Sequence, residues 1–112
     1  MLDLYDAPQP DVALLRPKTD FYLSGHPNPS DILLLIEVAA SSLDYDREVK
    51  APLYASKGVA EYWLVDLNDD LISRYLDPSG GMYQTVTHHR RGESVAPRLL
   101  PDCVLEVAEL LP

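Results

Sequence analysis

The stretch ILLLIEVA, residues 32–39, decides the fold, because it is apolar on both of the faces that a β-strand presents. A strand of this kind is typical of the centre of a sheet that is covered on both sides. Glu37 is the one charged residue in the stretch, and a buried carboxylate is costly unless it is paired or bound to a metal. We therefore expect a central strand that carries a carboxylate with a specific partner.

A helix is expected directly after this strand. Residues 41–44 offer candidates for the N-cap, and the pattern predicts a helix from Leu43 to Ala55 that Gly58 would end. Pro52 falls inside this span, so it should kink the helix or begin a second segment there. The side chains expected to face the core are those of Leu43, Val49, Leu53 and Tyr54.

Further strands are expected on both sides of this unit. Asp11 to Leu15 follows a rigid proline and is predicted to be a short strand, and residues 16–29 form a loop rich in Pro, Gly, Asn and Ser. Three strands separated by turns are predicted after the helix, at Glu61–Leu67, Leu71–Leu76 and Met82–His88. Shorter elements are expected at Met1–Tyr5 and Val104–Leu111. This order predicts an α/β fold, a mixed β-sheet with one principal helix, in a single domain of residues 1–112.

Charge and cysteine content narrow the classes of function. The 112 residues include 18 Asp and Glu but 9 Lys and Arg, a net charge of −9, which argues against broad binding to nucleic acid through a basic surface. It does not exclude a nuclease, in which metal ions supply positive charge. The single cysteine, Cys103, cannot form an internal disulfide, and the lack of a disulfide suits a reducing cytoplasm. Its side chain is expected to be buried. The apolar run from Ile32 to Ile36 is too short to cross a bilayer, so we expect no membrane contact.

Three residues are candidates for chemistry, and each has an ordinary structural alternative that is favoured when the residue is taken alone. Glu37 could sit at the end of its strand and reach water or pair with a lysine. Asp11 could cap a turn, a frequent use of Asp beside Pro. Lys50 follows Asp46 by four residues, so the two could form an exposed salt bridge that contributes little to stability.

Other polar and aromatic residues favour structural roles. The run HHRR at 88–91 could contact phosphate, but it fits a solvated strand end better. Asp66 closes a strand before a turn and is expected to cap it. Trp63 and Tyr54 are expected to pack in the core, although Tyr54 would share a helix face with Lys50.

Four segments keep an order and spacing that resembles a known family. They are QPDVALLRP (9–17), LLIEVA (34–39), SSLDYDREVK (41–50) and GVAEYWLVD (58–66). They are similar to the Uma-two (Uma2) family of restriction endonucleases, within the PD-(D/E)XK nuclease superfamily, and the resemblance runs through nearly the whole chain. It implies a restriction-endonuclease-like fold and DNA as the substrate of an endonuclease.

The resemblance also implies a catalytic set of Asp11, Glu37 and Lys50. Asp11 matches the aspartate of a Pro-Asp pair and Glu37 the second acidic ligand, which together would hold Mg²⁺ or Mn²⁺. The lysine of such nucleases usually lies two residues after that acid, where this chain has Ala39. The family's pattern places it on the following helix, where Lys50 matches. Lys50 would orient the attacking water or stabilise the charge on the phosphate in the transition state.

This chain departs from the family's pattern at its N-terminus. Members are usually longer there, so the chain is expected to begin inside the strand that precedes Pro10, as an N-terminally truncated form of the fold. Position 40, often polar in the family, is Ala40. The alternative function is therefore a non-catalytic remnant that serves as an interaction or oligomerisation module. An acidic chain with exposed strand edges is compatible with a homodimer.

Overall fold

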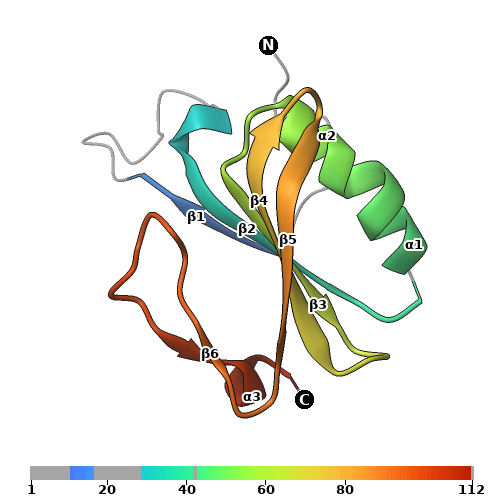
Figure 1. The fold of residues 1–112 in the computed structure, drawn as a ribbon, viewed down its shortest axis with the longest axis vertical. Helices are drawn as coiled ribbons and strands as arrows, with labels where there is room; N and C mark the ends of the chain where they lie inside the picture. Colours follow the sequence, from blue (N-terminus) through green and yellow to red (C-terminus); the bar gives the residue numbers. More distant parts are fainter. Residues whose placement is uncertain (1–10, 17–28, 42, 112) are drawn as a thin grey trace.

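A five-stranded sheet and a segmented helix dominate the structure (Figure 1). The structure is a computed structural model, and it describes residues 11–16, 29–41 and 43–111. The strands of the sheet, in their spatial order, are β1 (Val12–Leu15), β2 (Ile32–Ala39), β3 (Glu61–Asp66), β4 (Leu71–Ser79) and β5 (Met82–Arg90). The smaller elements are η2 (Pro29–Asp31), the paired strands β6 (Ser94–Val95) and β7 (Leu105–Glu106), and the helix α3 (Val107–Leu110).

The pairing of β2 explains why its sequence is apolar on both faces. β2 lies between β1 and β3, antiparallel to the first and parallel to the second. The remaining neighbours in the described sheet, β3 with β4 and β4 with β5, are antiparallel. A parallel pair needs a crossover connection, and the main helix provides it between β2 and β3. The predicted mixed sheet with one principal helix is therefore confirmed, and β2 has the predicted bounds.

Three segments that follow one another without a break form the main helix. They are α1 (Leu43–Tyr45), the π-helical turn η3 (Asp46–Lys50) and α2 (Ala51–Ser56). Pro52 lies in the first turn of α2, directly after the π-helical turn, so a second segment begins there as expected. Leu43 and Tyr54 are buried as predicted, but the prediction for Val49 is wrong, because its side chain is 47% exposed. The wider π turn that contains Val49 changes which side chains face the sheet.

Each face of the sheet carries its own apolar core. The main helix covers one face, where Leu35 and Ala39 of β2 pack with Tyr54 of the helix. The C-terminal elements cover the other face, and the buried side chains there are those of Leu34, Ile36, Trp63, Val65, Ile72, Val95, Val107 and Leu111. Trp63 is fully buried, as the sequence predicted. Since side chains alternate along a strand, Glu37 falls on the helix side, between Leu35 and Ala39.

The C-terminal part differs most from the sequence prediction. β4 and β5 continue to Ser79 and Arg90, beyond the predicted ends at residues 76 and 88. Cys103 is exposed rather than buried, because it lies in the loop between β6 and β7, and such loops run over the surface. The element predicted at Met1–Tyr5 lies outside the described residues, as does most of the predicted 16–29 loop. Within the described residues, the helices are too short and too polar to cross a membrane.

Candidate active site

Glu37 lies near the end of β2 and faces the main helix. Its side chain is 4% exposed, so its charge needs partners inside the protein. Glu37 Oε2 lies 3.1 Å from Lys50 Nζ, and Glu37 Oε1 accepts a hydrogen bond of 3.1 Å from the Tyr54 hydroxyl. The main helix therefore supplies both partners, one turn apart, because Lys50 and Tyr54 are four residues apart.

Lys50 contacts a second carboxylate, that of Asp46. The distance from Lys50 Nζ to Asp46 Oδ1 is 3.2 Å, and the two side chains are 13% and 2% exposed. The ion pair that the sequence suggested between these residues is therefore present, but it is buried with Glu37 and not exposed, because both side chains face the sheet. Removing one member of a buried ion pair leaves an uncompensated charge, so its energetic effect exceeds that of a surface pair.

Asp11 lies directly before β1, beside Glu37. Val12 pairs with Ile36 in the antiparallel register of β1 and β2, which brings the preceding residue, Asp11, level with Glu37. Asp11 Oδ2 accepts a hydrogen bond of 2.6 Å from the backbone N–H of Val38. The structure thus brings Asp11, Glu37 and Lys50 to one corner of the sheet, with Asp11 the most exposed of the three.

The ionisation of this corner reflects its burial. Burial raises the pKa of Glu37, and the charge of Asp11 acts in the same direction, while Lys50 and Tyr54 oppose the shift. Burial acts to lower the pKa of Lys50, but the hydrogen bonds and charges of Glu37 and Asp46 outweigh it, so this pKa lies above its usual value. Burial and the charge of Glu37 raise the pKa of Tyr54, so its hydroxyl stays protonated and donates to Glu37.

The Tyr54 hydroxyl is expected to stabilise the fold through Glu37. Tyr54→Phe removes one buried hydrogen bond and should lower the free energy of unfolding by about 1 kcal/mol. Urea denaturation monitored by circular dichroism measures the change. Tyr45→Phe is the matched control, because Tyr45 is 47% exposed on the same helix and should change the stability by less than about 0.5 kcal/mol. Equal stability of the Tyr54→Phe variant and the wild type would contradict this role.

The carboxylate oxygens at this corner are the type of ligand that suits a hard divalent cation, one that keeps part of its hydration shell. Within residues 11–16, 29–41 and 43–111, no group of three or more His, Cys, Asp or Glu side chains is placed to hold a metal ion. Mg²⁺ is commonly held by one or two carboxylates, with waters and substrate phosphates as the other ligands. Asp11 and Glu37 are the two carboxylates that could serve in this way, since the register of β1 and β2 places Asp11 level with Glu37.

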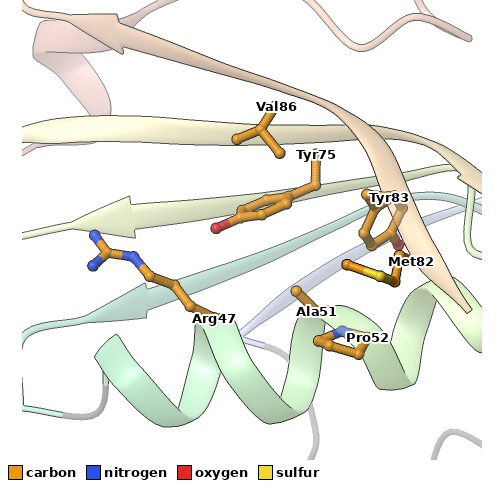
Figure 2. A pocket seen from close by; sticks show the side chains of 7 residues that line it. All are labelled: Arg47, Ala51, Pro52, Tyr75, Met82, Tyr83 and Val86. Atoms are coloured by element: carbon orange, nitrogen blue, oxygen red, sulfur yellow. The ribbon is translucent and has the colours of Figure 1, made fainter.

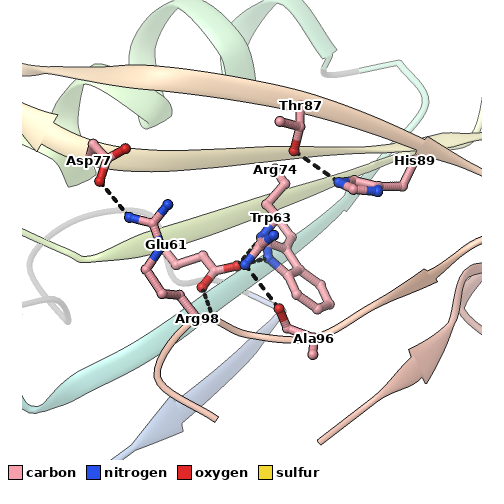
Figure 3. A network of polar contacts seen from close by, with 8 residues as sticks. All are labelled: Glu61, Trp63, Arg74, Asp77, Thr87, His89, Ala96 and Arg98. Carbon is pink, nitrogen blue, oxygen red and sulfur yellow. Dashed lines mark hydrogen bonds and ion pairs between the residues drawn. The ribbon is translucent and has the colours of Figure 1, made fainter. Parts of the chain in front are cut away.

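A third buried carboxylate, that of Glu61 in β3, was not singled out from the sequence. It lies on the opposite face of the sheet from the main helix and accepts three hydrogen bonds (Figure 3). The donors are Trp63 Nε1 at 2.6 Å, Arg74 Nε at 2.5 Å and the backbone N–H of Arg98 at 2.7 Å. Arg74 also donates to the carbonyl of Ala96 at 3.0 Å. These bonds attach the C-terminal segment to the sheet, so we assign Glu61 a structural role.

Asp66, at the end of β3, caps the following turn as the sequence predicted. Its Oδ1 accepts hydrogen bonds of 2.9 Å from the backbone N–H groups of Asn68 and Asp69. Its Oδ2 lies 2.7 Å from Nη2 of Arg47 on the main helix. Asp66 therefore joins the turn to the helix and is not part of the corner formed by Asp11, Glu37 and Lys50.

The basic run 88–91 is engaged with neighbouring strands and turns. Arg91 makes two hydrogen bonds to the Asp70 carboxylate, and Arg90 donates to the carbonyl of Asp69 at 3.3 Å. His88 Nδ1 lies 3.0 Å from the hydroxyl of Ser73. These contacts support the structural alternative that the sequence favoured for this run.

A cavity of about 150 Å³ lies between the main helix and the strands β4 and β5 (Figure 2). The residues that line it are Arg47, Ala51, Pro52, Tyr75, Met82, Tyr83 and Val86. Its one charged side chain, Arg47, is paired with Asp66. No carboxylate lines this cavity, so it is not a candidate metal centre.

The fold and the corner together define a class of protein: a mixed α/β sheet whose central strand presents a buried carboxylate to a lysine of the crossover helix. Residues 2–108 match the model of the Uma2 family, whose description is "Putative restriction endonuclease". The match covers nearly the whole chain, so this protein belongs to the Uma2 family, and the resemblance inferred from the four segments is confirmed. The restriction-endonuclease-like fold is confirmed with it. No curated protein matches the chain.

Proposed function

We propose that this protein is a divalent-metal-dependent endonuclease that hydrolyses phosphodiester bonds of DNA at the corner formed by Asp11, Glu37 and Lys50. The observation that carries the proposal is the contact of 3.1 Å between Glu37 Oε2 and Lys50 Nζ, beside the second carboxylate of Asp11. Metal-dependent phosphodiester hydrolysis uses anionic ligands for the metal ion and is helped by a positive charge near the phosphate. Membership of a restriction endonuclease family supports the same chemistry.

Each residue of the corner has a distinct role in this proposal. Glu37 of β2 and Asp11, directly before β1, would supply oxygen ligands to the metal ion. A bound Mg²⁺ or Mn²⁺ would polarise the scissile phosphate and lower the pKa of a bound water. Lys50 Nζ orients the attacking water or stabilises the negative charge that develops on the phosphate. Because Lys50 sits on the helix that crosses from β2 to β3, the fold itself sets its position relative to Glu37.

Cleavage of plasmid DNA tests the proposal. The full chain is incubated with supercoiled plasmid in Mg²⁺, in Mn²⁺ and in EDTA, and the products are separated on agarose. Nicked or linear DNA is expected with either metal and not with EDTA. Intact plasmid under every condition, from protein shown to be folded by circular dichroism, would contradict the proposal and favour a non-catalytic interaction module.

Metal binding should stabilise the protein through Asp11. Bringing two carboxylates together costs free energy that a cation offsets, and at ten times the dissociation constant one site adds about 1.4 kcal/mol to the free energy of unfolding. Mg²⁺ or Mn²⁺ should therefore raise the thermal midpoint measured by differential scanning fluorimetry. Asp11→Asn should abolish most of the shift, while it can still accept the hydrogen bond from Val38.

Asp102→Asn is the control for this measurement, because Asp102 is exposed in the loop before β7. That variant should keep the full metal-induced shift. A wild-type midpoint that stays unchanged at millimolar metal would argue against a metal site at this corner.

A further inference from the structure

We propose that Asp46 is a positioning residue for Lys50. When Glu37 binds a metal ion, the Asp46 carboxylate keeps the Lys50 ammonium at the site. The inference rests on the proposed function, because it takes Glu37 to be a metal ligand. It assigns a role to a residue that the sequence suggested only as a surface partner of Lys50.

The geometry places one ammonium between two buried carboxylates. Lys50 Nζ lies 3.1 Å from Glu37 Oε2 and 3.2 Å from Asp46 Oδ1. Asp46 precedes Lys50 by one helical turn, so the helix backbone fixes this pair. The Tyr62 hydroxyl donates to the backbone carbonyl of Asp46 at 3.5 Å, and the ring of Tyr45 lies 5.8 Å from Lys50 Nζ. The sheet therefore contacts the backbone of Asp46 through Tyr62, and the helix places Lys50 against its carboxylate.

These contacts make the Lys50 ammonium a competitor for any cation at Glu37. Two cations cannot share one carboxylate oxygen at close range without strong repulsion in a buried setting. The ammonium must move away from Glu37 Oε2 when a metal ion binds there. Asp46 gives it a buried partner in its present position, so a small movement suffices and Lys50 stays near the phosphate. Without the charge of Asp46, the ammonium would pair with Glu37 alone and oppose metal binding.

Mn²⁺ binding to four forms of the full chain tests this role. The dissociation constant is measured by electron paramagnetic resonance of free Mn²⁺ for the wild type, Asp46→Asn, Lys50→Met and the double variant. Asp46→Asn should weaken binding by about fivefold or more, the lower end of coupling energies between interacting sites. Lys50→Met should bind Mn²⁺ at least as tightly as the wild type, because the competing ammonium is gone. The double variant should match Lys50→Met, because Asp46 acts only through Lys50.

The double variant separates positioning from a purely structural role. If Asp46 only stabilises the fold, Asp46→Asn should weaken binding equally in the presence and absence of Lys50, and that result would overturn the inference. Wild-type affinity in the Asp46→Asn variant would overturn it too. Should Asp46→Asn alone fail to fold, the comparison of Lys50→Met with the double variant still decides between the two roles.

Asp44→Asn is the matched control, since Asp44 is an exposed aspartate on α1, two residues before Asp46, and its replacement should leave Mn²⁺ binding unchanged. Wild-type protein that binds no Mn²⁺ would refute the proposed metal site and this inference together. Mn²⁺ binding that is equal in all four forms would refute the inference alone.

Discussion

Replacing Lys50 with methionine is expected to slow metal-dependent DNA cleavage by about a hundredfold or more, as is typical for the loss of one positioned donor in the transition state. Methionine keeps most of the length of the side chain but removes its charge. Since an ammonium is not a metal ligand, Mn²⁺ binding should survive the substitution. The variant would therefore bind metal but cleave DNA slowly. This combination distinguishes the role of Lys50 from that of the proposed metal ligands, Asp11 and Glu37.

Because Lys50 is largely buried, the experiment must control for a loss of stability in the Lys50→Met variant. Lys50 neutralises two buried carboxylates, so its loss should also lower stability, and rates must be compared per folded molecule at saturating Mg²⁺. Arg98→Met removes the same charge from a side chain that is 54% exposed and paired with Asp77. That variant should cleave at the wild-type rate. Equal rates for the wild type and Lys50→Met would end the assignment of Lys50 as the catalytic lysine.

The centre of the fold could be predicted from the sequence because the residue pattern of β2 is typical of one kind of element, a central strand. Eight residues that are apolar on both faces, interrupted by one glutamate, indicate a central strand and a carboxylate that needs a partner. The predicted bounds of β2 match the structure. The lysine partner came from the resemblance to the Uma2 family, whose pattern places a lysine on the following helix, where Lys50 matches.

The inward side of the main helix could not be predicted in the same way. The side chains that face the sheet include Leu43, Asp46, Lys50 and Tyr54, spaced by three, four and four residues. Two of these four are charged, and hydrophobic patterning assigns charged residues to the solvent side. It therefore placed Val49 inside and the Asp46–Lys50 pair outside. The burial of Asp46 and Lys50 is explained by Glu37, which faces them from β2 and pairs with Lys50.

The C-terminal segment illustrates a second limit of sequence patterns. Glu61 begins β3 in the segment GVAEYWLVD that resembles the family, yet its partners come from residues 63, 74 and 98. Trp63 and Arg74 lie on paired strands, but the third donor is a backbone N–H in a loop that has no recognisable periodicity. A long-range contact of this kind leaves no local signal, so a structural glutamate could not be distinguished from an exposed one.

Glu61→Ala is expected to lower the free energy of unfolding by about 3–5 kcal/mol, the usual cost of breaking a buried ion pair by removing one partner. Glu61 is 1% exposed, and its loss would leave Arg74 Nε, the Trp63 indole N–H and the Arg98 backbone N–H without their acceptor. Urea denaturation at constant pH measures the change, with circular dichroism and tryptophan fluorescence as independent probes of a two-state transition.

The matched control is Glu109→Ala, which removes the same side chain from an exposed position in α3 and should cost less than about 0.5 kcal/mol. Glu61→Gln should fall between the two variants, because the amide oxygen can still accept hydrogen bonds while the charge opposite Arg74 is lost. Glu61 lies on the face of the sheet away from Glu37 and Lys50, so the folded fraction of Glu61→Gln should bind Mn²⁺ with wild-type affinity. A loss of stability in Glu61→Ala no larger than in Glu109→Ala would show that the network does not hold the C-terminal segment to the sheet.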